Sequence, residues 1–416
     1  CSSDLMWFWR SWKCYRARQE TPNTAPTHTL RKWSAPAGLA EKQDRDFIHM
    51  DREAYQNRRE QFKKFAETAL AAVAEETDEK EKFPDYIVEI LAKKGWMGLP
   101  FRTEYGGLGL DKMTLGLCIE ELSKVCASTG LIVSTHTLLC GGPIEKYGTA
   151  QQKTRYLKPL AKGKKLGAFG LTEPSAGTDI YGMETTAAED QGQWVLNGRK
   201  IFITNAPEAE IYVIFAVTDR KDGGRKEISV FIAEKGTPGF HFGKKERKMG
   251  IRGAANTELI FENCRIPSSN ILGKIGEGNK IGLDTLNEGR IGIAFEALGI
   301  AQGAFDKTAA YVKSREQFGK KISDFQNTRF QLAQMKTRIE ASRLLVYEAA
   351  LCGTGEEDFP AKAAMAKLFA SETAMEVTEK AVQLHGGYGY LREYGVERMM
   401  RDAKITEIYE GTSEVQ

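Results

Sequence analysis

The chain has few of the residues that build metal sites, disulfide frameworks or membrane spans. Its seven cysteines are scattered and none forms a C-x2-C pair, which argues against a cysteine-based zinc site or an iron–sulfur cluster. Its five histidines lie far apart and none belongs to an H-E-x-x-H motif, so no metal is predicted. No run of about 20 apolar residues is present, so we expect no membrane-spanning helix. An odd number of cysteines on a long chain indicates reduced thiols in a cytosol-like compartment.

A strong charge of one sign is also lacking. Lys and Arg number 59 and Asp and Glu number 56, so the formal net charge is +3. Nucleic-acid binding usually shows a concentrated basic face, so no nucleic-acid partner is expected. With 41% hydrophobic and 28% charged residues, the 416-residue chain has the composition of a globular protein, and its length predicts two to four domains.

Common nucleotide-binding and hydrolase motifs are missing too. The sequence contains no G-x-x-x-x-G-K-[ST], no G-x-G-x-x-G after a predicted strand and no G-x-S-x-G. A P-loop, a Rossmann dinucleotide site and a nucleophile elbow therefore have no support. Any cofactor must be held by a different scheme.

Residues 1–50 differ from the rest of the chain. Four of the six tryptophans lie here, and basic residues outnumber acidic ones. The composition loosely fits a transit peptide, and a basic, Trp-rich helix could also lie on a membrane surface. We favour a third interpretation, a disordered or non-native extension, because residues 1–5 ahead of Met6 resemble translated adapter sequence and Met50 offers another start.

Helical periodicity covers both flanks of the remaining chain. In residues 51–166 apolar positions recur at helical spacing, and Asp111 follows a glycine loop where it can cap a helix. In residues 276–416 a run of positions steps by 3, 4, 3 and 4, which predicts a helix-bundle seam. The seam positions are Leu332, Met335, Ile339, Ser342 and Val346.

Short β-rich runs occupy residues 167–275 between these flanks. Turn residues separate the runs at Asn197-Gly198, Asp222-Gly223-Gly224 and Pro238-Gly239. The spacing predicts an antiparallel β domain, so the expected layout is helices, a β domain and a helical bundle.

Three segments carry candidate chemistry, and each also has a purely structural interpretation. Residues 169–179, FGLTEPSAGTD, form a surface turn or a loop whose small residues and hydroxyls hold a polar or phosphorylated ligand. Residues 383–390, QLHGGYGY, form a glycine cap of a helix or a place where backbone approaches a diphosphate. Residues 407–414, EIYEGTSE, end one helix and cap the next, or present Glu410 as a general base whose pKa is raised in an apolar patch.

In this order and spacing, the three segments resemble the signatures of the acyl-CoA dehydrogenase family. The matching patterns are G-L-T-E-x-x-A-G-T-D, Q-x-x-G-G-x-G-Y and I-Y-E-G-T-S-E, and the stretches 248–253, 264–267 and 315–319 agree with them. The resemblance runs from about residue 51 to residue 416 and is greatest to bacterial short-chain, butyryl-CoA-type dehydrogenases. It implies an N-terminal helical domain (51–166), an antiparallel, barrel-like middle β domain (167–275) and a C-terminal four-helix bundle (276–416).

The resemblance implies FAD as cofactor and an acyl-CoA as substrate. Arg315, Gln326 and residues 383–387 would hold the ADP half of FAD, typically across a subunit interface. The residues implied to bind FAD are Phe169, Gly170, Leu171, Thr172, Gly177, Thr178, Phe202, Ile203, Thr204, Arg315, Phe318, Gln326, Gln383, Leu384, His385, Gly386, Gly387, Thr412, Ser413 and Glu414. Those implied to contact acyl-CoA are Thr178, Asn287, Glu288, Gly289, Arg290 and Gly411.

The same resemblance assigns Glu410 as the catalytic base, which takes the α-proton while hydride leaves Cβ for flavin N5. Hydrogen bonds to the thioester carbonyl, from a flavin ribityl hydroxyl and the Glu410 backbone N–H, would stabilise enolate-like charge. One branch of the family carries its base one position before Arg290, where this chain has Gly289, so the sequence favours Glu410. Glu288 should point elsewhere, because adjacent helical residues are rotated by about 100°.

Some positions depart from the family pattern. Gly395 stands where relatives often have Pro, Phe202 where many have Trp, and Ser175 where Gly or Asn is usual. The chain stops six residues after Glu410, whereas relatives continue for another helical turn or more, so we expect a truncated end that affects the last helix and flavin affinity.

Partners and specificity follow from the resemblance alone. It implies electron transfer to electron-transfer flavoprotein, a homotetramer built as a dimer of dimers, and a cytoplasmic location in a bacterium or the mitochondrial matrix in a eukaryote. Two alternatives stay open: a dehydrogenase for 2-methylbutyryl- or isobutyryl-CoA, and a flavoprotein of the same fold without dehydrogenase turnover. The physiological direction and membership of an electron-bifurcating complex also stay open.

Overall fold

The computed structural model describes residues 52–220, 226–353 and 355–416. Residues Arg58–Gln416 form one compact unit, and Cys1–Asn57 form another, of which only residues 52–57 are described. The interpretations of residues 1–50 and the predicted turn at Asp222-Gly223-Gly224 lie outside the described residues. Within the described part of the chain, no helix combines the length and apolar character needed to cross a membrane.

The described residues begin with helices, as the periodicity of residues 51–166 predicts. Asp111 is the N-cap predicted from the sequence: its side chain accepts a hydrogen bond from the Thr114 backbone N–H at 2.7 Å and so satisfies an otherwise unpaired donor of the first turn. Three segments in this part are π-helical, η1 (Ala66–Leu70), η4 (Thr135–Gly141) and η5 (Lys153–Leu157). The α-helices are α3 (Arg52–Phe65), α4 (Ala71–Glu79), α5 (Asp85–Lys93), α6 (Lys112–Ser123), α7 (Ala127–Ser134), α8 (Gly142–Tyr147), α9 (Ala150–Gln152) and α10 (Lys158–Ala161).

The middle of the chain forms one eight-stranded sheet with the order β6-β7-β3-β2-β4-β5-β8, and β1 also pairs with β4. Most neighbours are antiparallel, but β1 and β2 each pair with β4 in parallel, so the prediction of an antiparallel domain is wrong at these two pairings. A long connection rather than a tight turn joins β1 to β4, which permits the parallel direction. The strands are β1 (Gly167–Gly170), β2 (Thr186–Asp190), β3 (Gln193–Thr204), β4 (Ile211–Arg220), β5 (Lys226–Glu234), β6 (Phe240–Lys245), β7 (Asn256–Pro267) and β8 (Ile271–Leu272).

The predicted turn at Asn197-Gly198 is also wrong. Both residues lie inside β3, where the register against β7 shifts between Leu196 and Gly198. Gly198 has φ of 145°, and a Cβ at this position would lie 2.4 Å from Thr185 Oγ1. Glycine is therefore needed here for a β-bulge and a close approach, not for a chain reversal.

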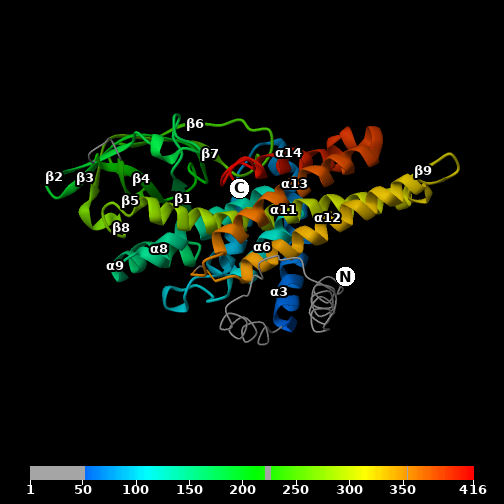
Figure 1. The fold of residues 1–416 in the computed structure, drawn as a ribbon, viewed down its shortest axis with the longest axis horizontal. Coiled ribbons are helices and arrows are strands. Elements are labelled where there is room, and N and C mark those ends of the chain that lie inside the picture. The colour runs from blue at the N-terminus through cyan, green and yellow to red at the C-terminus, as the bar shows by residue number, and fades with distance from the viewer. Residues whose placement is uncertain (1–51, 221–225, 354) are drawn as a thin grey trace, which may run out of the picture. The chain divides into compact units, whose positions relative to one another are not determined.

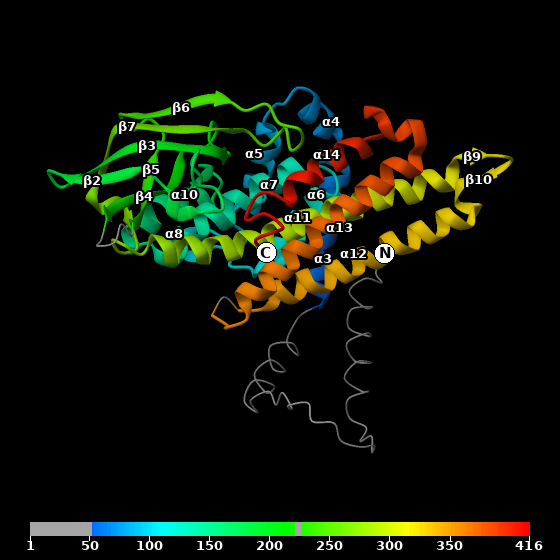
Figure 2. The same ribbon diagram turned by 45° about the horizontal axis from the view of Figure 1, so that its top comes forward.

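Helices return after the sheet. Met335, Ile339, Ser342 and Val346, four of the five predicted seam positions, are fully buried. In Figures 1 and 2 the three long helices run side by side away from the sheet, and the short strands between the first two lie at their far end. These elements are α11 (Gly278–Ser314), β9 (Glu316–Gln317), β10 (Lys320–Lys321), α12 (Gln326–Leu351), α13 (Phe359–His385) and α14 (Val396–Thr406).

A continuous apolar core joins the sheet to the helices. Leu139 of η4 belongs to the same buried cluster as Phe169 and Leu171 beside it and Phe215 of β4. Buried His136 adds a polar link, because its Nδ1 accepts from the Gly167 backbone N–H at 3.1 Å and its Nε2 lies 3.2 Å from the Leu160 carbonyl oxygen. This junction fixes β1 and the loop after it against the helices.

A buried ionic network holds the helices themselves. Glu120 of α6 pairs with Arg59 of α3 at 2.8 Å and with Arg343 of α12, and it accepts a hydrogen bond from the Tyr347 hydroxyl at 2.9 Å. Arg343 also donates to Gln302 of α11 at 2.9 Å. Side chains of four helices, α3, α6, α11 and α12, therefore meet in one buried network of paired charges.

Candidate active site

Glu410 lies just after α14, with its carboxylate against the middle of α11. A Cβ at Gly289 of α11 would lie 2.5 Å from Glu410 Oε2 and 2.8 Å from a methyl carbon of Leu139. Only glycine leaves room for the carboxylate at this point of the helix. Glu410 itself has φ of 55°, a left-handed conformation that non-glycine residues rarely adopt and that is common at functional sites.

One oxygen of the Glu410 carboxylate is buried, and two cations, Arg290 and Lys367, act on the group. The residue is partly exposed, yet its Oε2 atom is buried and has no hydrogen-bond partner among the described residues. Burial raises the pKa of Glu410 to about 7, although the nearby charges of Arg290 and Lys367 oppose this rise. Such a carboxylate is a stronger proton acceptor than one in water, and it ionises near neutral pH.

The backbone around Glu410 is held by groups that the motifs did not reveal. Lys367 of α13 is fully buried and donates from Nζ to the Gly411 carbonyl oxygen at 2.7 Å. The Tyr409 hydroxyl donates to Oε2 of buried Glu296 of α11 at 2.8 Å. The Glu410 backbone N–H has no acceptor in the described ranges 52–220, 226–353 and 355–416, so it is available to a ligand.

A buried ion pair shapes the first predicted segment. Glu173 accepts from Lys200 Nζ at 2.6 Å and from the Thr185 backbone N–H at 3.0 Å, while Lys200 also donates to the Leu171 carbonyl oxygen at 3.2 Å. Coulombic attraction from Lys200 and these hydrogen bonds lower the pKa of Glu173 despite its burial. Glu173 is itself buried, so it anchors the loop from inside, while Gly177, Thr178 and Asp179 at the end of the segment are exposed.

The outward face of this loop and of β3 contains several predicted flavin residues. Thr178 and Gly177 are exposed, and a Cβ at Gly177 would meet nothing within 4 Å. Phe202 has φ of 59° and is 65% exposed, although it is a large aromatic residue, whereas Ile203 beside it is buried. The exposed ring of Phe202, on a residue whose backbone is left-handed, is suited to packing against a flat ligand.

The predicted substrate residues of α11 are neighbours of Gly289 in the chain, but they do not all lie on its face of the helix. Arg290 donates to Asn287 Oδ1 at 2.9 Å, and its Nε is buried without a partner among the described residues. Glu288 points away from Glu410 and pairs with Lys112 of α6, as the helical rotation predicted. A Cβ at Gly292, one turn further along, would lie 2.3 Å from Ser134 Oγ and 2.6 Å from a methyl carbon of Leu138, so η4 and the end of α7 pack closely on this part of α11.

The predicted flavin residues around Arg315 and Gly386 gather at the other end of the bundle. Arg315 lies over the ring of Tyr388 at 5.1 Å, and the Tyr311 ring stacks on His385 at 4.2 Å, so the ends of α11 and α13 meet there. Phe318 is 94% exposed, and added Cβ atoms at Gly386 and Gly387 would meet nothing within 4 Å. Because α11 rises by about 1.5 Å per residue, Arg315 lies roughly 37 Å along the helix from Arg290. The structure does not bring the two groups of predicted flavin residues together within one chain.

Gly386 ends α13 with φ of 60°, which agrees with the glycine cap predicted for the second segment.

The third segment, residues 407–414, is only partly as expected. After Glu410, however, the described chain makes a turn in which the Val415 N–H donates to the Thr412 carbonyl at 2.9 Å, so the described residues show no next helix for this segment to cap. Gln416 donates to the carbonyl oxygens of Glu410 at 3.1 Å and Gly411 at 2.8 Å.

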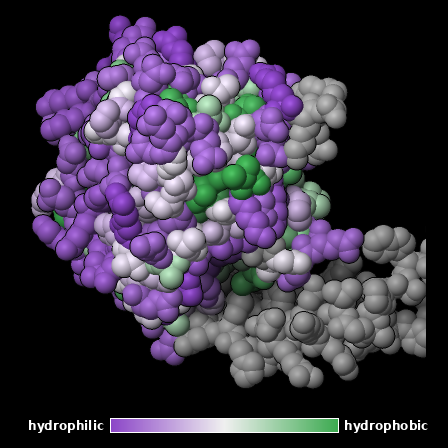
Figure 3. Space-filling view, turned by 90° about the vertical axis from the view of Figure 1, so that its left-hand side faces the viewer, coloured by the Kyte–Doolittle hydropathy of each residue, from purple (hydrophilic) through white to green (hydrophobic). Residues whose placement is uncertain are grey.

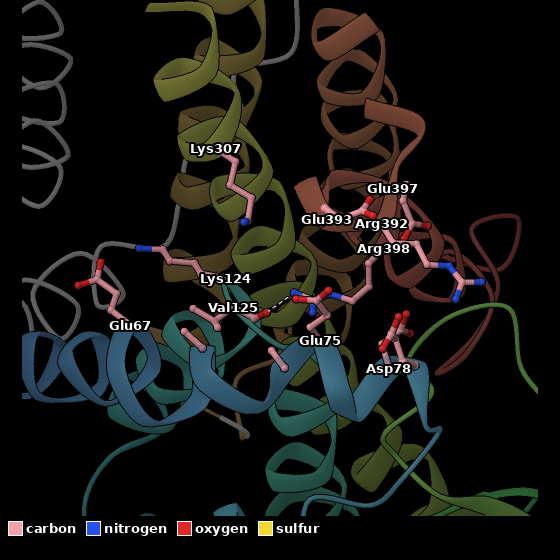
Figure 4. A pocket seen from close by; sticks show the side chains of 14 residues that line it. Glu67, Glu75, Asp78, Lys124, Val125, Lys307, Arg392, Glu393, Glu397 and Arg398 are labelled. Atoms are coloured by element: carbon pink, nitrogen blue, oxygen red, sulfur yellow. Dashed lines mark hydrogen bonds between the residues drawn. The ribbon is translucent and has the colours of Figure 1, made fainter. Parts of the chain in front are cut away.

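A cavity of about 300 Å³ lies between α4, α11 and α14, and no predicted site residue lines it. Its charged side chains include Glu75, Lys307 and Arg398, and Arg398 reaches across to donate to the Val125 carbonyl at 2.8 Å (Figure 4). Acids and bases are mixed on its walls, so its lining does not select a ligand of one charge.

The surface at the β-domain end is mostly hydrophilic, with a small hydrophobic group in its centre (Figure 3). The exposed apolar side chains of this domain and of the start of α11 include Tyr181, Phe202, Ile275 and Leu283.

Comparison with known proteins matches this arrangement. Family models of the acyl-CoA dehydrogenase N-terminal, middle and C-terminal domains match residues 52–164, 168–264 and 276–416. The short-chain specific acyl-CoA dehydrogenase of Clostridium acetobutylicum is 52% identical over 358 residues, which cover 86% of this chain and 94% of that protein. The chain belongs to the acyl-CoA dehydrogenase family. It is therefore an oxidoreductase, and its predicted resemblance to bacterial short-chain members is confirmed.

Solved acyl-CoA dehydrogenases share the fold. Butyryl-CoA dehydrogenase from Megasphaera elsdenii is 47% identical, with a TM-score of 0.84 over 86% of this chain and 95% of that one. A chain from a structural study of the electron transferring flavoprotein of Acidaminococcus fermentans and the mechanism of flavin-based electron bifurcation is 50% identical, with a TM-score of 0.85 over 88% of this chain and 97% of that one. The predicted three-domain fold is confirmed. Solved proteins of this fold include FAD complexes. FAD is therefore the cofactor of this chain, as the resemblance implied.

Proposed function

We propose that this acyl-CoA dehydrogenase removes hydrogen from Cα and Cβ of short-chain acyl-CoA thioesters, as in the conversion of butyryl-CoA to crotonyl-CoA, with Glu410 as the base. The observation that carries the proposal is the Glu410 carboxylate, which packs against Gly289 with an oxygen that is buried and unpartnered in the described structure. A buried acceptor without a donor is costly unless it serves a ligand or a reaction. Similarity to short-chain members supports the C4 substrate.

The protein would supply the base, a hydrogen-bond donor and an apolar surface that excludes water. Ionised Glu410 accepts the α-proton of the thioester, and the free Glu410 backbone N–H donates to the thioester carbonyl, where negative charge develops. Leu139 and Gly289 form an apolar surface beside the carboxylate, which excludes water and fixes the approach of the acyl chain. Asn287, Arg290, Gly411 and Thr178 are the proposed contacts to the rest of the acyl-CoA.

The residues present fit FAD. The exposed Phe202 ring, the open space at Gly177 and the backbone groups of the loop from Phe169 to Thr178 would hold the isoalloxazine, together with Thr412, Ser413 and Glu414. When bound, FAD accepts the β-hydride of the substrate. The distance between the two groups of flavin residues supports a site shared by two copies of the chain, in which Arg315, Phe318, Gln326 and residues 383–387 of one copy hold the ADP half for another. We therefore propose a homotetramer built from such dimers.

Electron-transfer flavoprotein is the proposed acceptor of the electrons. The similarity to a chain studied with the electron transferring flavoprotein of Acidaminococcus fermentans supports this partner. The proposed location is the cytoplasm if the source is a bacterium and the mitochondrial matrix if it is a eukaryote.

Anaerobic titration of the FAD-loaded protein tests the function. Butyryl-CoA should bleach the flavin absorbance near stoichiometrically, and a panel of straight and branched C4–C8 thioesters ranks the alternatives. Faster reduction by 2-methylbutyryl- or isobutyryl-CoA would replace the straight-chain assignment with a branched-chain one. A flavin that no acyl-CoA reduces would instead indicate a flavoprotein of this fold without dehydrogenase turnover.

A further inference from the structure

Glu410 holds an unfavourable backbone conformation. Its φ is 55° and that of Gly411 is 92°, so two successive residues are left-handed and the first of them carries a side chain. Such a residue keeps its conformation only when its surroundings fix it. The groups that fix the backbone around Glu410 therefore decide where its carboxylate points.

Tyr409 and Glu410 are both fastened to one face of α11. The Glu410 carboxylate packs on Gly289, while the Tyr409 hydroxyl donates to Glu296 Oε2 at 2.8 Å. Positions 289 and 296 are seven residues apart, so they lie on the same side of the helix, about two turns from each other. The two neighbouring side chains thus reach two points on a single rigid element.

Glu296 has no other visible role in the described part of the molecule. It is fully buried, it has no ion-pair partner there, and its second oxygen, Oε1, is buried and unpartnered. The charged groups that act on it are Asp402 and Glu410, both acidic, and burial raises its pKa well above the ordinary value. A buried carboxyl group that accepts one hydrogen bond from a tyrosine and leaves its second oxygen unpartnered is costly as packing, and it is explained by what that tyrosine holds.

The other side of Glu410 is fastened as well. Buried Lys367 donates to the Gly411 carbonyl at 2.7 Å, from α13 rather than from α11. The strained residue is therefore held from Tyr409 on one side and from Gly411 on the other. Rotation of the 410 backbone would require one of these buried bonds to break.

We propose that Glu296 is a positioning residue for Glu410: by accepting the Tyr409 hydrogen bond it keeps the strained backbone of Glu410 in the conformation that points the carboxylate at Gly289. Its effect on catalysis rests on the proposed function, whereas its effect on the backbone does not. The interaction needs an acceptor at position 296 and no negative charge. Glutamine should therefore replace Glu296, and leucine should not.

Hydrogen exchange and flavin reduction test the role in the FAD-loaded full chain. In Glu296→Leu and Tyr409→Phe, amides of the peptide covering 407–414 should exchange at least about tenfold faster. Reduction by butyryl-CoA should slow by about 10–100-fold, because a small displacement of a catalytic group has an effect of this size, while substrate affinity changes less than about threefold. Glu296→Gln should keep the amide exchange rate and the rate of flavin reduction within about threefold of wild type. Because Glu296 and Tyr409 act through one hydrogen bond, the double variant Glu296→Leu/Tyr409→Phe should reduce the flavin no more slowly than the slower single variant.

Tyr347→Phe is the matched control, because it removes another buried tyrosine–carboxylate bond, to Glu120, away from the site. It should leave exchange at 407–414 and the reduction rate unchanged. Unaltered exchange in both Glu296→Leu and Tyr409→Phe would overturn the positioning role, and so would a Glu296→Gln protein as impaired as Glu296→Leu. Failure of butyryl-CoA to reduce the wild-type flavin would defeat the proposed function, and the exchange result would still decide the role of Glu296.

Discussion

The carboxylate of Glu410 lies in the space that a side chain at Gly289 would occupy. A Cβ at 289 would lie 2.5 Å from Glu410 Oε2 and 3.0 Å from its Cδ, far inside van der Waals contact. The two positions are 121 residues apart in the sequence, on α11 and after α14. The relationship explains why a chain with this carboxylate at 410 has no side chain at 289.

Gly289→Ala should therefore displace the Glu410 carboxylate and slow flavin reduction by butyryl-CoA by about 10–100-fold. FAD content should stay unchanged, because Gly289 is not among the proposed flavin contacts. Gly282→Ala on the same helix is the control, since its Cβ would lie 3.2 Å from the Phe215 ring and does not approach Glu410. Equal rates in the two variants would show that the carboxylate does not depend on Gly289.

The rate of flavin reduction should depend on pH with a midpoint near 7. Glu410 must be ionised to accept a proton, and burial raises its pKa to about 7, so the rate should rise with pH through this value and level off above it. Arg290→Gln removes a cation that lowers the pKa of Glu410, so the midpoint should move to higher pH, whereas Arg290→Lys should move it little. Stopped-flow reduction between about pH 5.5 and 8.5 measures this, and a flat profile would contradict the assignment of the titrating base.

Lys200→Met should weaken FAD binding. It leaves the buried Glu173 carboxylate without its cation and frees the Leu171 carbonyl, so the loop from Leu171 to Thr178 loses its anchor. We expect the dissociation constant of FAD to rise by at least about tenfold, which corresponds to about 1.4 kcal/mol. Lys235→Met, an exposed lysine that donates to the Pro207 carbonyl, is the control. Identical FAD affinity of the two variants, measured by flavin fluorescence, would argue against this role of the pair.

Arg343→Met should destabilise the helical domains without altering the base. It leaves Glu120 buried beside one cation instead of two, and breaking such a buried pair costs about 3–5 kcal/mol. Arg338→Met removes a half-exposed ion pair to Glu376 and should cost about 1 kcal/mol or less. Urea unfolding followed by circular dichroism compares them at equal protein concentration, and similar midpoints would mean that the Glu120 network contributes little.

Local patterns in the sequence predicted much of the fold. The seam on α12 and the cap at Asp111 depend on interactions within a few residues, which a single sequence displays. The parallel pairing of β1 with β4 and the bulge at Gly198 depend on which distant strand lies alongside, so turn chemistry alone misassigned them.

The site divides in the same way. Its motif segments contain Glu410 and the glycines beside the proposed ligands, because close backbone approach requires particular residues at fixed spacing. Lys367 and Glu296 belong to no motif, since each acts through one bond to a residue far along the chain. A charged residue inside an apolar helical run was the only available signal, as in the sequence around Glu296.

Anaerobic rapid mixing of butyryl-CoA with the FAD-loaded wild type and with Glu410→Gln tests the central claim most directly. The amide keeps the size of the side chain but cannot accept the α-proton, so bleaching of the flavin should slow by about 10²–10⁴-fold. Both proteins should retain bound FAD and bind the thioester with similar affinity. A Glu410→Gln protein whose flavin is reduced at the wild-type rate would show that Glu410 is not the base.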